Sequence, residues 1–154
     1  MEKEKNTGEV ERYLAEKGEI LYRTNGVSMR PLIKSEKDAV RIVRKEPESR
    51  CKKYDIALYR RRETPERLVL HRIIGVTPDG YTALGDNCLN KEVGIREEDV
   101  VGVLSEVIKP RRVLSADRTP MKIYGRLWVF LYPARRLWMV TKSRAAKLLK
   151  RILG

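Results

Sequence analysis

The sequence contains few of the residues that most often carry chemistry or cross-link a chain. Its 154 residues include one histidine, one phenylalanine and two cysteines. Cys51 and Cys88 form no C-x-x-C pair and would supply at most two ligands to a metal ion, so we expect reduced thiols. Neither a metal ion nor a cofactor is expected.

Long hydrophobic runs are also missing. The longest uncharged apolar stretch near the C-terminus, residues 127–134, has about eight residues, whereas a membrane-spanning helix needs about 20. Residues 1–5 are mostly charged and lack the apolar segment of a secretory signal. The sequence therefore predicts a cytoplasmic protein.

Acidic residues are absent from the C-terminal part of the chain. From Arg118 to Gly154 lie ten of the 34 basic residues and none of the 21 acidic ones. Most of the formal net charge of +13 therefore belongs to this cationic segment. Positive charge of this kind attracts anionic partners, such as a phospholipid surface, nucleic acid or an acidic polypeptide.

The middle of the chain has the pattern of short strands. Turn formers, among them Asn25-Gly26 and Pro78-Asp79-Gly80, separate runs rich in Val, Ile, Leu and Tyr. These runs are residues 19–23, 39–44, 56–60, 67–76, 81–84 and 100–108. Because no long helical pattern lies between them, we expect a mainly β, antiparallel domain over residues 19–110.

Both ends of the chain have helical patterns. Residues 1–18 predict a short amphipathic helix, with Asn6 and Glu9 in capping-box spacing and Gly18 as its stop. Residues 111–154 predict a basic amphipathic helical segment. Its apolar residues Ala145, Leu148, Leu149 and Ile152 recur at helical intervals.

Three residues are candidates for catalysis. His71 is the single imidazole and suits a general base near pH 7, although a hydrogen-bonded core histidine is the alternative. Ser28 follows a strand and a glycine turn at Gly26, where its hydroxyl can project and backbone N–H groups can stabilise an oxyanion. Asp86 would orient the His71 ring, as a triad carboxylate does. The alternatives are an ordinary turn serine and an aspartate that bonds its own backbone.

Four motifs occur in an order that resembles a known family. They are Gly-Val-Ser-Met-Arg-Pro at residues 26–31, Leu-His-Arg-Ile-Ile-Gly at 70–75, Gly-Asp-Asn at 85–87 and Asp-Val-Val-Gly at 99–102. Together they resemble the signal peptidase I superfamily, which includes the self-cleaving domains of SOS and phage repressors. The histidine at position 71 is similar to the archaeal and endoplasmic-reticulum members, since bacterial members have lysine there.

The resemblance implies a signal-peptidase-like β domain and a serine endopeptidase that cleaves a preprotein or leader peptide. Ser28 would be the nucleophile and His71 the base, with Asp86 and Glu92 as acidic partners. Bacterial members often have, two residues before the nucleophile, a serine whose hydroxyl donates to the oxyanion. This chain has Gly26 at that position, so backbone N–H groups, including that of Ser28, would stabilise the oxyanion instead. The substrate would bind as an extended strand. The transmembrane anchor typical of the family is not evident here.

The cationic segment suggests a location for the enzyme. A basic amphipathic helix with tryptophans suits an anionic membrane surface, so we expect peripheral attachment to the inner membrane face. The residues expected there are Trp128, Arg135, Arg136, Trp138, Lys147, Lys150 and Arg151. The alternative is a helix whose apolar face docks on the β domain. Nucleic acid is not expected, because no helix-turn-helix, zinc or aromatic platform motif is present.

Three other functions stay open. The chain would be a non-catalytic cationic binding module if the motifs are retained without activity. It would be a repressor-type self-cleaving regulator, although the residues before Ser28 are too few for a helix-turn-helix domain. In the third alternative, Cys88 would be the nucleophile in place of Ser28 and would form a dyad with His71, although Cys88 follows Gly-Asp-Asn and not a nucleophile turn.

Overall fold

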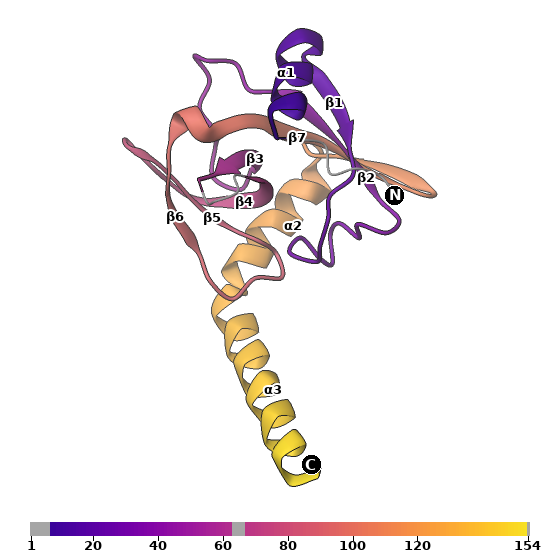
Figure 1. Cartoon of the computed structure of the whole chain (residues 1–154), viewed down its shortest axis with the longest axis vertical. Helices are drawn as coiled ribbons and strands as arrows, with labels where there is room; N and C mark the ends of the chain where they lie inside the picture. Colours follow the sequence, from indigo (N-terminus) through magenta and orange to yellow (C-terminus); the bar gives the residue numbers. More distant parts are fainter. Residues whose placement is uncertain (1–6, 63–66, 154) are drawn as a thin grey trace.

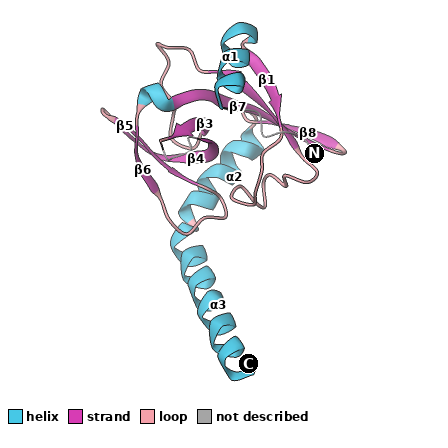
Figure 2. Ribbon diagram, viewed as in Figure 1, coloured by secondary structure: helices cyan, strands magenta, loops and turns pink. Residues whose placement is uncertain are grey.

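An eight-stranded antiparallel sheet dominates the computed structural model, which describes residues 7–62 and 67–153, with side chains as far as residue 145 (Figures 1 and 2). The strands are β1 (Glu19–Tyr22), β2 (Ala39–Arg44), β3 (Ile56–Arg61), β4 (Arg67–Thr77), β5 (Gly80–Leu84), β6 (Glu92–Ile95), β7 (Val100–Lys109) and β8 (Arg112–Ser115). Their order in the sheet is β1-β2-β7-β3-β4-β5-β6, with β8 paired to β7. The expected mainly β, antiparallel fold is confirmed.

All six expected strands are present, and the sequence missed two. β6 has only two large apolar residues, and β8 begins with an arginine, so neither has the alternation of a longer strand. β8 lies beyond residue 110, which means that the sheet continues past the boundary that we placed there. A short 3-10 helix, Glu97–Asp99, precedes β7.

The N-terminal helix α1 (Thr7–Lys17) covers one end of the sheet. Val10 and Leu14 are each 1% exposed and belong to a core that includes Val40 and Ile42 of β2. The helix ends at Gly18 as expected: the φ of this residue is +79°, and its N–H donates to the Leu14 carbonyl at 2.9 Å. Asn6, the expected cap, lies outside the described residues.

Along the described part of the chain, β1 and the first half of β4 each have an open backbone edge. β1 is the edge of the sheet, since it pairs only with β2. In β4, residues 67–71 pair with β3 on one side, whereas pairing with β5 on the other side begins at Arg72. An open backbone edge is a template for a further strand.

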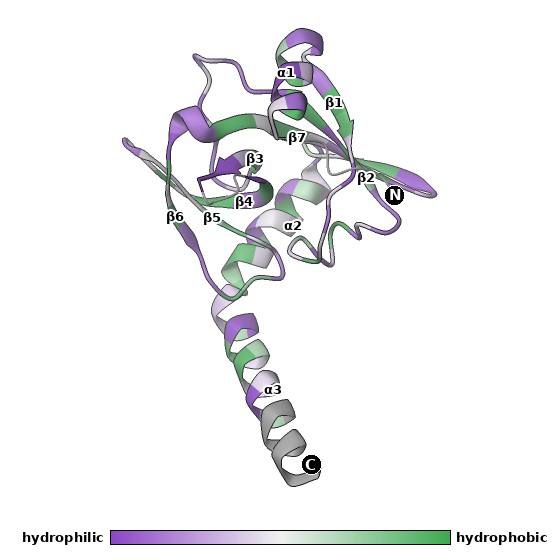
Figure 3. Cartoon of the chain, in the orientation of Figure 1, coloured by the Kyte–Doolittle hydropathy of each residue, from purple (hydrophilic) through white to green (hydrophobic). Residues whose placement is uncertain are grey.

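The basic C-terminal segment is helical, as expected. It forms α2 (Thr119–Phe130) and α3 (Tyr132–Leu153), which follow each other with a slight break, and α3 extends away from the sheet (Figure 1). Apolar and hydrophilic residues alternate along α2 and along α3 as far as residue 145 (Figure 3). Among the helices described here, none has the length and apolar character required to cross a bilayer.

Gly102 of β7 tests the packing of β7 against β2. A Cβ atom at this buried position would lie 2.5 Å from Cγ2 of Ile42 and 2.8 Å from the Val43 carbonyl oxygen. We expect Gly102→Ala to lower the free energy of unfolding by about 1–3 kcal/mol through overpacking, measured by urea unfolding. Gly8→Ala is the control, because nothing lies within 4 Å of a Cβ atom there. An unchanged midpoint for Gly102→Ala would contradict this packing.

Candidate active site

Ser28 lies in a tight turn after β1. Gly26 has a φ of +90°, a conformation that favours glycine, and the Arg30 N–H donates to the Val27 carbonyl at 3.1 Å. Asn87 holds the turn from outside: its backbone N–H donates to the Ser28 carbonyl at 2.7 Å, and its side-chain amide donates to the Val27 carbonyl at 3.2 Å. The Gly-Asp-Asn motif therefore supports the nucleophile turn directly.

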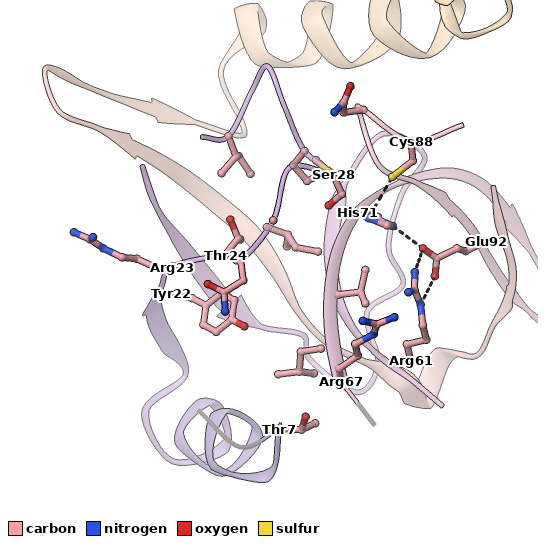
Figure 4. Close-up of a pocket in the computed structure, with 18 of the residues that line it drawn as sticks. Thr7, Tyr22, Arg23, Thr24, Ser28, Arg61, Arg67, His71, Cys88 and Glu92 are labelled. Carbon is pink, nitrogen blue, oxygen red and sulfur yellow. Dashed lines mark hydrogen bonds and ion pairs between the residues drawn. The ribbon is translucent and has the colours of Figure 1, made fainter. Parts of the chain in front are cut away.

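His71 lies on β4 opposite Ala57 of β3 and is 4% exposed. Its Nε2 atom faces the Ser28 turn, with Sγ of Cys88 at 4.0 Å (Figure 4). Between Ser28 Oγ and His71 no hydrogen bond is recorded in the described structure. Catalytic hydrogen bonds often tighten only when substrate binds, so the lack of this bond does not exclude Ser28 and His71 as nucleophile and base.

Gly85 makes the close approach of these groups possible. A Cβ atom at this position would lie 2.9 Å from His71 Nε2, 2.8 Å from the Ser28 carbonyl oxygen and 2.6 Å from Cys88 Sγ. Any larger residue would push the base away from the nucleophile turn. The sequence analysis named Gly85 only as part of the Gly-Asp-Asn motif and missed this role.

Glu92 holds the other side of the imidazole ring. Its Oε1 atom lies 2.8 Å from His71 Nδ1 (Figure 4), and the Tyr59 hydroxyl lies 3.3 Å from the same nitrogen. Arg61 binds the carboxylate with both Nε, at 3.0 Å, and Nη2. The arrangement is therefore histidine oriented by an ionised carboxylate, with Tyr59 and Arg61 as partners that the sequence analysis did not identify.

The ionisation of this pair follows from its contacts. Burial by itself would raise the pKa of Glu92, but hydrogen bonds from His71, Arg61 and Tyr59 outweigh it and lower the pKa to about 2. Burial would lower the pKa of His71, but hydrogen bonds with Cys88 and Glu92 outweigh it, and the pKa is raised. Glu92 thus remains an anion that stabilises a protonated imidazole.

Asp86 does not face the imidazole, and the expectation that it orients His71 is corrected. Its two carboxylate oxygens each accept a hydrogen bond from Arg72 at 2.8 Å, and one also accepts from the Tyr124 hydroxyl at 3.2 Å. Arg72 and Asp86 are 2% exposed. The aspartate of the Gly-Asp-Asn motif is therefore part of a buried ion pair, and Glu92 is the carboxylate at the ring.

A groove of about 1330 Å³ runs from this site between the two open strand edges. Leu21 and Tyr22 of β1, followed by residues 23–26, line one wall, and residues 67–71 of β4 line the other. Ser28, His71, Cys88 and Glu92 also line it. The groove thus places the nucleophile turn and the base beside two backbone edges.

The expected membrane residues fall into three groups. Trp128 and Arg135 face the β domain: the indole N–H of Trp128 donates to the Asp86 carbonyl at 2.9 Å, and Arg135 donates to the same oxygen. Arg136 and Trp138 are exposed. Lys147, Lys150 and Arg151 lie outside the residues whose side chains are described. The expectation for Trp128 and Arg135 is therefore wrong, because both pack on the Gly-Asp-Asn turn.

The cysteines are chemically distinct. Burial raises the pKa of the Cys51 thiol to about 11, which makes it unreactive. Cys88 is partly exposed and lines the groove. In the described residues, no group of three or more His, Cys, Asp or Glu side chains is arranged to hold a metal ion.

Comparison of the chain with protein-family models, with curated proteins and with solved structures found no match.

The single histidine permits a direct test of the Glu92 contact. We expect the His71 pKa, followed by NMR titration of the imidazole protons, to lie above about 6.5 and to fall in Glu92→Gln, because the neutral amide no longer favours the imidazolium. Glu98→Gln is the control, since Glu98 pairs with Arg62 and Arg96. Equal His71 pKa values in Glu92→Gln and wild type would contradict the contact.

A second variant tests the structural role of Asp86. We expect Asp86→Ala to lower the free energy of unfolding by about 3–5 kcal/mol, because it leaves the buried Arg72 guanidinium unpaired. Asp79→Ala, at an exposed turn, is the matched control. Chemical unfolding of both variants measures the difference, and equal stabilities would show that the Arg72–Asp86 pair does not hold the turn.

Proposed function

We propose that the protein is a serine endopeptidase in which Ser28 is the nucleophile, His71 the general base and Glu92 the carboxylate that orients the base. The observation that carries this proposal is the placement of the only imidazole, with Glu92 at 2.8 Å from Nδ1 and Nε2 facing the Ser28 turn. A serine hydroxyl needs such a base to become a nucleophile near pH 7.

The reaction would proceed by acyl transfer. His71 Nε2 takes the proton of the Ser28 hydroxyl as its oxygen bonds to the substrate carbonyl carbon, and the imidazolium then protonates the leaving amine. Water, deprotonated by His71, releases the acyl group and restores the serine. Glu92 stabilises the imidazolium in both steps because its lowered pKa keeps it ionised.

The Ser28 backbone is suited to stabilise the oxyanion. Across the described residues its N–H has no recorded hydrogen-bond acceptor, and it lies in the turn opened by Gly26. An N–H that is already positioned lowers the barrier as negative charge develops on the carbonyl oxygen. This role agrees with the absence of a serine hydroxyl at position 26.

The groove supports a peptide substrate bound as an extended strand. The Ile73 N–H donates to the Asp55 carbonyl on the β3 side at 2.7 Å, and backbone groups alternate along a strand. Those of Leu68 and Leu70 therefore point away from β3 and are available to a substrate strand. Main-chain hydrogen bonds of this kind give affinity with little dependence on sequence.

The order of the four motifs supports membership of the signal peptidase I superfamily, in its histidine branch. A preprotein or a leader peptide is the corresponding substrate. The four motifs include Ser28, His71 and the turn that holds Ser28, while Glu92 takes the place of the aspartate that family members use after Gly-Asp-Asn.

A serine-reactive fluorophosphonate probe tests the assignment. We expect wild type and Cys88→Ala to be labelled and Ser28→Ala to be unlabelled, with labelling of His71→Ala slower by about 100-fold or more. Ser49→Ala, at an exposed turn, controls for nonspecific reaction. Persistent labelling of Ser28→Ala excludes Ser28 as the nucleophile. If wild type is not labelled, the serine mechanism is excluded, and a thiol-reactive probe on wild type and Cys88→Ala then distinguishes a Cys88–His71 dyad from a binding module.

A further inference from the structure

Six large apolar side chains are exposed on one face of α2 and α3. They are Ile123, Leu127, Phe130, Leu131, Leu137 and Trp138, which we call the apolar stripe. Phe130 is 79% exposed and Trp138 is 68% exposed. Its positions recur at intervals of three, four and seven residues, as 123, 127, 130 and 137 and as 127, 131 and 138, so they share one side of the helices. Contiguous exposed apolar patches usually mark interaction sites.

The opposite side of these helices is already occupied by the β domain. Tyr124 and Trp128 contact Asp86, as described above, and the Tyr132 hydroxyl donates to the Leu89 carbonyl at 2.6 Å. Met139 lines the substrate groove from α3. Since the aromatic side holds the helices in place, the β domain does not cover the apolar stripe. The alternative, in which the apolar face of the tail docks on the β domain, is therefore wrong for these six residues.

The charges beside the stripe favour an anionic partner. Lys122, Arg126, Arg136, Lys142 and Arg144 are all exposed on α2 and α3. Lys122 lies 3.8 Å from Asp117, and no acidic residue follows Asp117 in the sequence, so α2 and α3 themselves hold no carboxylate that could neutralise the other four. Two copies joined through the stripe would bring these cations together, whereas a surface of anionic headgroups over an apolar interior complements both the charge and the stripe.

We propose that the apolar stripe docks α2 and α3 flat on an anionic phospholipid surface, with Phe130, Leu137 and Trp138 in the headgroup layer and the basic side chains on the phosphates. Met139 reaches the groove from the same helix, so the groove stands about one helix diameter, ~10 Å, from the lipid. Docking needs neither Ser28 nor catalysis and thus stands or falls independently of the proposed peptidase activity.

Vesicle co-sedimentation of the full chain tests this inference. We expect binding to phosphatidylcholine vesicles that contain phosphatidylglycerol and much weaker binding to phosphatidylcholine alone. Phe130→Ser combined with Trp138→Ser should weaken binding at least about tenfold, because each side chain loses its burial in the lipid. Val93→Ser removes an equally exposed apolar side chain from β6 and should bind as wild type. Ser28→Ala should also bind as wild type.

The charge requirement is tested separately. Lys122→Gln, Arg126→Gln and Arg136→Gln in one chain should weaken binding to the anionic vesicles by about tenfold or more, since each basic residue near such a surface contributes about 1 kcal/mol. Because all five substituted positions are exposed, urea unfolding should show unchanged midpoints, which separates lost docking from lost folding.

Two results would overturn the proposal. One is vesicle binding by the Phe130→Ser/Trp138→Ser variant that equals binding by wild type. The other is a wild-type chain that does not bind anionic vesicles but sediments as a dimer, with the same double substitution restoring the monomer; the stripe would then be a self-association surface.

Discussion

The buried ion pair between Arg72 and Asp86 holds together the parts of the proposed catalytic site. Arg72 follows His71 on β4, and Asp86 precedes Asn87, whose backbone N–H binds the Ser28 carbonyl. One pair of bidentate hydrogen bonds therefore fixes the strand that bears the base relative to the turn that bears the nucleophile. Such a pair is costly to break because the remaining charge stays buried, which restricts relative movement of the two elements.

The same pair explains why a second carboxylate is needed. Both oxygens of Asp86 are engaged by Arg72, so they cannot also hold the imidazole. Glu92 comes from β6, on the far side of β5, and meets His71 at Nδ1. Arg61 of β3 donates hydrogen bonds to the Glu92 carboxylate, so this carboxylate remains ionised despite its partial burial. Two acids that are close in the sequence thus serve different purposes, one in holding the turn and one in orienting the base.

Much of this arrangement could be predicted from the sequence, and there are physical reasons why the rest could not. The strands with buried apolar alternation, such as β2 and β7, could be predicted because their pattern depends on local burial alone. Ser28 and His71 could be singled out because turn chemistry and a lone imidazole are local features. The choice between Asp86 and Glu92 depends on which side chain reaches across β5, and β6 has too few apolar residues to be recognised as a strand. Likewise, a helical pattern does not show which of its faces meets the sheet, and this is why Trp128 and Arg135 were misplaced.

The basic side chains of the C-terminal helices lie in two different environments, one against the β domain and one in solvent. Arg135 lies over the Trp128 ring at 4.0 Å and donates to Asp86, and burial lowers its pKa. The Arg135 side chain therefore stabilises the fold, whereas Arg126 and Arg136 are exposed to solvent on the same helices as the apolar stripe. Because Trp128 and Arg135 hold the carbonyl of the residue before Asn87, the position of α2 and the start of α3 is tied to the Ser28 turn. Met139 of α3 lines the groove, so this helix also contributes to the groove wall. A surface that fixes the apolar stripe would therefore also fix the orientation of the groove relative to that surface.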